Sequence, residues 1–396
     1  MNDLIHIDFE TYSEVDLTKV GPWMYSIHPT TEVLWMAEWD SDISPVPQIF
    51  EGHDSDFGEQ LILETVGDLL WMPARKKKKL GGWNIEFETC IIANTLGFGT
   101  DAIDYIQWED SQAMAGAMAL PQALAICGYA LQIPKEKMKM AEGKSLISLL
   151  TRPQRITQKK WDENGYDLVE HYERLPHLDD GYYIYYRNRD PELIEQFGLY
   201  CAGDVEAEAY IHSQLRPLPE RERQVWVQVQ ERNLAGMKID LGLCKQAIKL
   251  YQRQKKIELS QIKEMTNLDN PNSRVQVKDW LERHGVHLPN LQKQTIEDIL
   301  KTDQVKGEVR KVLELRHSSA KPPPTNFATM AMRTDKRDWR MRGALWYHRA
   351  TTGREASVGV NWQNQYRPSM SDAEIVCQDI IKGDTEMLDL AYGGVM

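Results

Sequence analysis

The sequence predicts an α/β domain, followed by a mainly helical region and then by a short segment that contains strands. Residues 1 to about 215 alternate between strand-like and helix-like segments, which is typical of an α/β domain. From residue 220 to about residue 316 the pattern is almost wholly helical, with Lys, Gln, Glu and Leu dominating. Consecutive prolines in the stretch 321–325 cannot continue a helix, so the helical region ends there.

The elements of the first domain follow from local patterns. Residues 4–10, LIHIDFE, alternate as a strand, and residues 32–40 are expected to form a second strand that is antiparallel to the first or near it. Residues 78–84 predict a short strand and turn, and helical spacing marks the segments 57–71, 86–98, 120–131 and 144–153. The stretch 151–190 is polar and aromatic by turns, which indicates a long surface excursion. Pro191 is well placed to start a helix that runs to residue 215.

Two breaks give the expected domain boundaries. The sequence RPLPERE at residues 216–222 interrupts the preceding helix, and the prolines near residue 325 close the helical region. We therefore expect domains at 1–215, 216–325 and 326–396. Within the last of these, residues 338–359 alternate like strands of a small sheet, and residues 371–396 predict one helix with a glycine stop.

Composition excludes several classes of protein. No apolar run approaches the ~20 residues that span a bilayer, and the N-terminus lacks the features of a signal peptide. The 5 cysteines lie far apart with no C-x-x-C pair, which fits a reducing cytoplasm without a zinc site. The net charge of −12 counts against a nucleic-acid partner, but residues 301–368 hold 14 Lys and Arg against 6 Asp and Glu. A local basic face of this kind can bind phosphates whatever the total charge.

Carboxylates recur in a pattern that needs explaining. Asp8 and Glu10 lie on the same face of the first strand, roughly 6–7 Å apart, and two such charges repel unless a cation or a proton lies between them. An isolated pair would be most simply a solvated strand end. Glu88 follows near the start of a later helix, and Tyr200 and Asp204 share one face of another. Four carboxylates on three elements favour Mg²⁺ or Mn²⁺ over zinc.

The order D-x-E, then N-x-x-F-E, then Y-x-x-x-D resembles the three exonuclease motifs of the DEDD superfamily. Its tyrosine subtype includes the editing domain of family A DNA polymerases. The histidine subtype has a His five residues before the last Asp, where this sequence has Leu199. One departure is Glu88, since cellular polymerase I has Asp there. The resemblance implies a ribonuclease H-like domain, a mixed sheet flanked by helices, with a two-metal 3′–5′ exonuclease site.

The resemblance also implies roles for individual residues. Asp8, Glu10 and Asp204 would hold the tighter of two Mg²⁺ or Mn²⁺ ions, with Asp8 bridging to the second. Glu88 would act on the second ion through its water shell, and Tyr200 would orient the attacking water. Two further residues, Asn84 and Phe87, are candidates for holding the frayed terminal nucleotide of DNA. For Phe87, a place in the core is an equally good explanation.

Similarity to family A DNA polymerases continues beyond the first domain. Residues 222–240 resemble the entry to the polymerase domain, and residues 272–289 resemble the thumb, which grips primer–template duplex. The stretch 351–368 is similar to the T-G-R…Q-N signature beside the polymerase active site. That likeness implies template–primer contacts for Arg354, Gln363 and Asn364, although Gln365 and Tyr366 depart from the usual pattern.

The palm and fingers motifs that polymerisation requires do not occur in this sequence. We therefore expect either a fragment or the editing half of a split replicative polymerase, of phage type, whose palm and fingers lie on a separate chain. The predicted reaction is hydrolysis of the terminal phosphodiester at a single-stranded DNA 3′ end, which releases nucleoside 5′-monophosphates during proofreading. Two alternatives stay open: an exonuclease that acts on RNA, and a non-catalytic DNA-binding subunit of a split polymerase.

Overall fold

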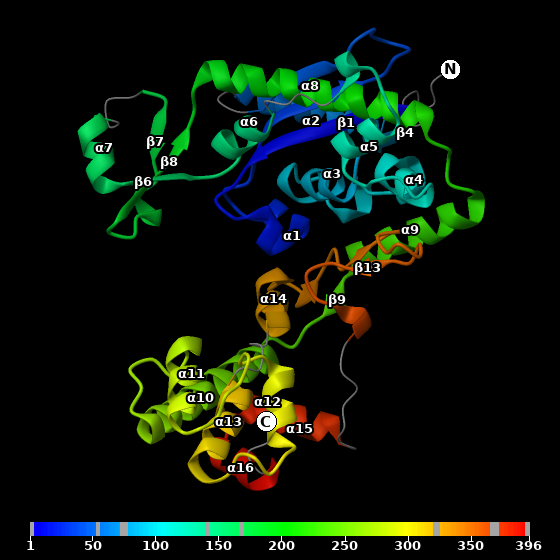
Figure 1. Ribbon diagram of the computed structural model, residues 1–396. Coiled ribbons are helices and arrows are strands. Elements are labelled where there is room, and N and C mark those ends of the chain that lie inside the picture. The colour runs from blue at the N-terminus through cyan, green and yellow to red at the C-terminus, as the bar shows by residue number, and fades with distance from the viewer. Residues whose placement is uncertain are drawn as a thin grey trace. The chain divides into compact units, whose positions relative to one another are not determined.

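The structure, a computed structural model, describes residues 4–52, 56–71, 78–138, 143–165, 170–319, 325–364 and 372–392 (Figure 1). The chain divides into two compact units. Unit 1 comprises Met1–Lys238 and Met332–Gln365, and unit 2 comprises Ile239–Ala331 and Tyr366–Met396. Residues 216–238 and 332–365 thus belong to the same compact unit as the N-terminal domain. The functional division at residues 215 and 325 stays a prediction.

Unit 1 is built on a mixed five-stranded sheet in the order β3-β2-β1-β4-β5. The strand β1 (Leu4–Tyr12) pairs antiparallel with β2 (Glu32–Trp39), which in turn pairs antiparallel with β3 (Gln48–Glu51). On its other side β1 runs parallel to β4 (Lys79–Gly82), and β4 runs parallel to β5 (Trp108–Asp110). The expectation of an α/β domain followed by a mainly helical region is confirmed, as is the antiparallel second strand. The strand β3 was not anticipated.

The helices of unit 1 complete this domain. They are α1 (Leu17–Ser26), α2 (Asp56–Trp71), α3 (Glu86–Cys90), α4 (Ser111–Ala117), α5 (Leu124–Ala130), α6 (Gly143–Leu150), α8 (Pro191–Gln214) and α9 (Glu220–Ala235). The helix expected over residues 86–98 is confirmed as far as Thr95, where it ends just before Gly97, and its second half, Ile91–Thr95, is π-helical rather than α-helical. The helix α8 begins as the sequence predicts, with Pro191 in its first turn and Asp190 as its N-cap.

The excursion over residues 151–190 has more structure than the sequence suggests. It contains the three-stranded sheet β6-β8-β7, formed by β6 (Gln154–Thr157), β8 (Tyr183–Asn188) and β7 (Tyr172–Arg174). The short helix α7 (Gln158–Asn164) packs on one face of this sheet through Trp161, whose ring centroid lies 5.3 Å from that of Tyr186. In Figure 1 these elements lie together at the end of unit 1 from which α8 starts.

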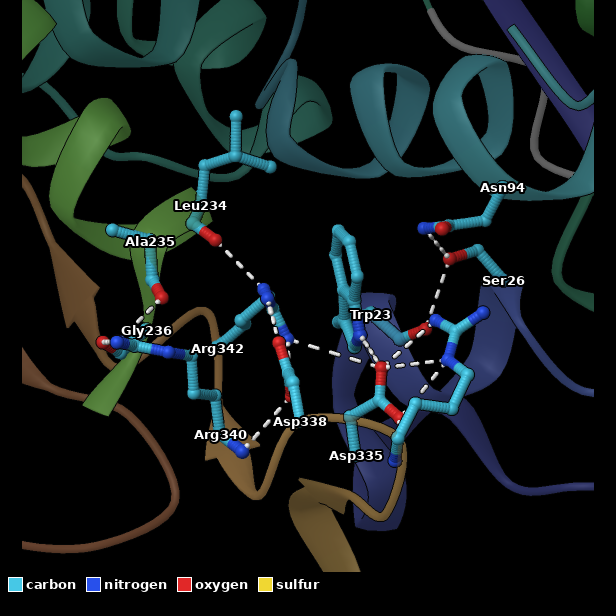
Figure 2. A network of polar contacts seen from close by, with 11 residues as sticks. Trp23, Ser26, Asn94, Leu234, Ala235, Gly236, Asp335, Asp338, Arg340 and Arg342 are labelled. Carbon is cyan, nitrogen blue, oxygen red and sulfur yellow. Dashed lines mark hydrogen bonds and ion pairs between the residues drawn. The ribbon is translucent and has the colours of Figure 1, made fainter. Parts of the chain in front are cut away.

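The chain leaves unit 1 after β9 (Met237–Lys238) and returns at β10 (Thr334–Asp335) and β11 (Arg340–Met341), which share a small sheet with β9. Figure 2 shows the polar network that fixes this return. Trp23 of α1 donates its indole N–H to the Asp335 carboxylate at 3.0 Å. The Arg342 guanidinium lies 4.1 Å from the Trp23 ring centroid and donates to the Leu234 carbonyl at 2.7 Å. The strands β12 (Leu345–Trp346) and β13 (Ala356–Ser357) follow as a short hairpin.

Unit 2 is helical. Its elements are α10 (Leu241–Thr266), α11 (Arg274–Arg283), α12 (Lys293–Leu300), α13 (Gly307–Ser319), most of α14 (Thr325–Arg333), α15 (Ala373–Lys382) and α16 (Thr385–Tyr392). Its core gathers around Ile262, Trp280, Leu281 and Leu313. The single helix expected over residues 371–396 is wrong, because Gly383 at φ 72° ends α15 and a second helix follows. This conformation favours glycine because it has no Cβ.

Among the described residues, every helix is too short or too polar to cross a membrane.

Asp335 should make the free energy of unfolding of unit 1 depend on pH in the acid range. Burial disfavours its charge, but hydrogen bonds from Arg337 and Trp23 prevail and lower its pKa to about 2. Because the folded pKa is depressed, this stabilisation is present above pH ~4 and is lost as the pH falls towards 2. Asp335→Asn should therefore lower the free energy of unfolding by about 2 kcal/mol at pH 7, and by almost nothing near pH 2.

Hydrogen exchange of the β1 amides in increasing urea measures this, since it reports on unit 1 alone. The exposed Asp101→Asn is the matched control and should change little at either pH. A loss for Asp335→Asn that stays constant between pH 7 and pH 2 would rule out the carboxylate charge as its cause.

Candidate metal centre

The strand β1 has one apolar face and one polar face. Ile5, Ile7 and Phe9 are buried in the main hydrophobic cluster of unit 1. Since side chains alternate along a strand, the other face carries three polar residues in a row, His6, Asp8 and Glu10. The helix α8 packs against β1 and β2. The polar face of β1 is thereby partly covered, with His6 buried and Asp8 and Glu10 half-buried.

Small and aromatic residues bring α8 close to the sheet. Trp35 of β2 donates its indole N–H to the Ile194 carbonyl of α8 at 2.9 Å. A Cβ atom at Gly198 would lie 2.8 Å from the Trp35 ring, so only glycine allows this approach. Cys201 lies on the same face of α8, with its sulfur 3.7 Å from the Asp8 carbonyl oxygen. These contacts set the distance at which the next turn of α8 faces β1.

Three predicted ligands come together at this interface. Asp8, Glu10 and Asp204 each offer a carboxylate oxygen, and these oxygens all lie within 4.8 Å of one another. Asp204 is buried, and the two strand residues are half-buried. A set of oxygen donors this dense is unfavourable without positive charge, and its chemistry fits a hard cation such as Mg²⁺ or Mn²⁺.

Glu88 of α3 adjoins the same cluster. Its side chain is 3% exposed. Burial raises its pKa well above the ordinary value, and the neighbouring charge of Asp8 and a hydrogen bond between the two side chains raise it further. The fourth predicted carboxylate therefore lies beside the first, and its surroundings favour the protonated form when no cation is bound.

Tyr200 lies one helical turn before Asp204 and is completely buried. Its ring stacks on Phe197 at a centroid distance of 5.8 Å, and a Cβ atom at Gly143 of α6 would lie only 1.9 Å from it. Burial raises the pKa of the phenol, and the charges of Asp204, Glu10 and Asp8 raise it further. The hydroxyl therefore stays protonated at neutral pH next to the carboxylates.

A buried polar network, which the sequence analysis missed, continues the site along α8. Glu208, one turn after Asp204, bonds to His6 of β1 through one oxygen and to Ser111 through the other. One turn further, His212 contacts the Glu109 carboxylate at 3.2 Å. Burial would raise the pKa of Glu208, but His6, His212 and Ser111 lower it overall. Sequence periodicity could have predicted this network, since His6 shares a strand face with Asp8 and Glu208 follows Asp204 at helical spacing.

The two candidates for nucleotide contact lie nearby but in different surroundings. Phe87 is half-buried against the main core, with its ring 6.0 Å from that of Tyr25. Asn84 adopts the left-handed conformation at φ 66°, and its backbone N–H donates to Asp110 at 3.1 Å. Packing of Phe87 is thus observed, and a contact of either residue with a nucleotide stays a prediction.

The three residues of the polymerase-like signature lie on other elements of unit 1 than the carboxylates. Arg354, Gln363 and Asn364 are exposed. Gln363 bonds to Ser357 of β13, and the side-chain amide of Asn364 donates to Asn361 at 3.2 Å. The departures at Gln365 and Tyr366 lie outside the described residues.

Comparison with known proteins relates this chain to a viral replication protein. No protein-family model matches the chain. The chain is 31% identical over 395 residues to the DNA polymerase of Bacillus phage SP02, across 99% of its own length. It spans only 55% of that relative. Among solved structures, it is similar to the POL domain of Pol1 from M. smegmatis in complex with DNA primer-template and dNTP, with a TM-score of 0.46, 10% identity, and coverage of 92% of this chain and 53% of the other.

Glu208 should hold the site together without touching a cation. Glu208→Ala leaves His6 and Ser111 without their buried partner, so we expect the free energy of unfolding of unit 1 to fall by about 3–5 kcal/mol. Loss of a residue that orients ligands should also weaken Mn²⁺ binding about tenfold to a hundredfold, measured by calorimetry.

The matched control is Glu206→Ala, two residues away on the same helix. Glu206 pairs with Lys137 at the surface, and its side chain is 32% exposed. That change should cost less than about 1 kcal/mol and leave Mn²⁺ affinity as it is. Equal losses of Mn²⁺ affinity in the two variants would contradict a positioning role for Glu208.

Proposed function

We propose that this chain is a 3′–5′ exonuclease that hydrolyses the terminal phosphodiester of a DNA strand and releases nucleoside 5′-monophosphates. The observation that carries the proposal is the convergence of Asp8, Glu10 and Asp204, whose oxygens lie within 4.8 Å of one another, with Glu88 and Tyr200 beside them. In this reading unit 1 contains a ribonuclease H-like domain of the tyrosine subtype of the DEDD exonucleases. The relation to a phage DNA polymerase supports an editing role.

The donor set fits two divalent cations, either Mg²⁺ or Mn²⁺. Asp8, Glu10 and Asp204 would hold one ion, with Asp8 shared with a second ion that Glu88 holds through its water shell. When bound, such ions acidify water and neutralise the charge that develops on the phosphate and on the leaving 3′ oxygen. The physical argument for the ions is the closeness of three like charges, whose oxygens lie within 4.8 Å of one another.

The chain's own residues would orient the reaction. Tyr200 keeps its proton, so its hydroxyl can bond to the attacking water and fix the direction of attack. Phe197 and Gly143 hold the Tyr200 ring in one position, which limits the reorganisation needed before attack. Asn84 and Phe87 would hold the terminal nucleotide, with the Phe87 ring as a stacking surface.

The rest of the chain would act on primer–template DNA. Unit 2 supplies a helical, thumb-like region, and Arg354, Gln363 and Asn364 would contact the duplex from unit 1. Because the chain spans about half of the related polymerase, the palm and fingers that polymerise DNA would lie elsewhere, on a separate chain or on a longer form of this one. Polymerisation by this chain alone is not part of the proposal.

Two other functions would use the same fold. A related exonuclease could trim RNA, which a comparison of DNA and RNA substrates of one sequence would reveal. A non-catalytic subunit could hold duplex for a polymerase chain, but such a subunit has no need for four carboxylates and a phenol in one place. The complete set therefore favours a nuclease.

Substitution of Asp8 tests catalysis directly. Asp8→Ala removes the carboxylate shared by both ions, so excision of a single-stranded DNA 3′ end in Mn²⁺ should fall by at least about a thousandfold. Tyr200→Phe keeps the ring and loses only the hydroxyl, so excision should fall by about 10²–10⁴ while Mn²⁺ affinity is retained. Release of labelled mononucleotide measures both. Nuclease activity that survives Asp8→Ala would contradict the proposal.

Editing should show in the choice of substrate. A mismatched primer terminus separates from its template at lower cost, so it reaches the site more often than a paired one. Excision from a mismatched 3′ end should therefore be faster than from a matched end, and the two rates should converge on single-stranded DNA. Equal rates on both duplexes would count against an editing role and leave the nuclease chemistry intact.

A further inference from the structure

The sheet β6-β8-β7 has one face that no hydrophobic cluster of the described residues covers. On β8 this face carries Tyr183, Tyr185 and Arg187, because alternate residues share a face. Across the sheet, Arg155 of β6 lies opposite Tyr185. The other face carries Ile184 and Tyr186 and is closed by Trp161 of α7.

Aromatic and charged groups lie side by side on this face, which also carries Glu173 of β7 opposite Arg187. The Arg155 guanidinium lies 4.8 Å from the centroid of the Tyr183 ring. Tyr182 lies beside it, 64% exposed, with its ring 4.7 Å from that of Tyr183. Flat rings and guanidinium planes at strand spacing, about 6–7 Å apart for alternate residues, offer successive surfaces on which bases can stack.

One end of the face lies beside the strand that carries Asp8 and Glu10. Its inner end, Arg187, is buried and lies 4.0 Å from the centroid of the Tyr12 ring, at the end of β1. Two further bonds join other residues of the stretch 151–190 to this strand end: Ser13 donates its backbone N–H to the Thr151 carbonyl at 3.1 Å, and His177 pairs with Glu14 at 2.9 Å. Asp8 and Glu10 belong to the same strand.

The sheet β6-β8-β7 is also connected along the chain to the two helices that surround Tyr200. The excursion leaves from the end of α6, whose Gly143 packs on the Tyr200 ring, and it returns at the start of α8, which carries Tyr200 and Asp204. The two helices that enclose the catalytic tyrosine thus also anchor the small sheet. Figure 1 shows β8 passing directly into α8.

We propose that the face formed by Arg155, Tyr183, Tyr185 and Arg187 binds single-stranded DNA and guides its 3′ end to Asp8, Glu10 and Asp204; this inference rests on the proposed function. A cluster of carboxylates repels a phosphate backbone, so the strand must be held by groups outside the cluster. The exposed Arg155 supplies positive charge, since the buried Arg187 is paired with Glu32, and the tyrosines supply stacking. Duplex DNA buries the faces of its bases, so this surface selects a single strand.

The length of the DNA oligonucleotide distinguishes a DNA-binding role of this face from a structural one. From Arg187 to Tyr183 the face extends about 13 Å, so only an oligonucleotide longer than the site itself can reach its outer end. Fluorescently labelled oligodeoxythymidine of 12 nucleotides and of 3 nucleotides are the probes. Binding is measured by anisotropy of the full chain in EDTA, and excision is measured in Mn²⁺.

Tyr183→Ala should weaken binding of the 12-nucleotide probe by about fivefold to a hundredfold, the range for loss of one stacked base. The KM for its excision should rise by a similar factor with kcat unchanged, and the KM of the 3-nucleotide probe should not move. Tyr183→Phe should restore binding. Arg155→Glu, a change of an exposed residue that keeps the fold, should weaken binding of the longer probe as well. Tyr129→Ala removes a tyrosine that is 71% exposed on α5 and is the control without effect.

Failure of this inference and failure of the proposed function give different results. The inference is overturned if excision continues and both Tyr183→Ala and Arg155→Glu bind and process the 12-nucleotide probe with the affinity and KM of the unchanged protein. The face would then be a candidate surface for a protein partner. Equal effects on the 3- and 12-nucleotide probes would also overturn it. If excision is absent but the longer probe binds and loses affinity in both variants, the face binds a single strand and the nuclease proposal fails.

Discussion

The packing of α8 on the polar face of β1 is the contact on which the rest of unit 1 depends. It encloses a row of ionisable side chains that water would otherwise solvate, and enclosed charges are costly unless each has a partner. Glu208 finds its partners in His6 of β1 and Ser111, the first residue of α4. These bonds fix which turn of α8 faces which residue of β1. Asp204 is thereby set opposite Asp8 and Glu10.

Next to Glu208, the same interface brings several like charges close together. Asp8, Glu10 and Asp204 offer oxygens within 4.8 Å of one another, and burial, followed by the charge of Asp8, raises the pKa of Glu88 beside them. A rigid scaffold can sustain this because Trp35, Gly198 and Gly143 hold α8 and the Tyr200 ring in place. The stability of the packed interface offsets the repulsion of the cluster, which a divalent cation would relieve.

Unit 1 is also notable for how the chain leaves and re-enters it. The exit strand β9 and the return strands β10 and β11 share one small sheet, and Asp335 connects that sheet to α1 through Trp23 (Figure 2). The polymerase-like segment around Arg354 is therefore part of the same compact unit as the carboxylates. A long helical insertion can be accommodated in this way because both of its ends are fixed at one place.

The sequence by itself determined the kind of site: alternation on β1 and helical spacing on α8 assign Asp8, Glu10, Tyr200 and Asp204 to common faces, since these periods are local properties of the backbone. It also determined the α/β class and the helical character of residues 220 to about 316. Only the tertiary structure decided that α8 lies over β1, that Glu208 meets His6, and that the excursion forms a sheet beside Tyr12. Contacts between residues two hundred positions apart leave no periodic signal, because they arise from the packing of whole elements and not from the local chain.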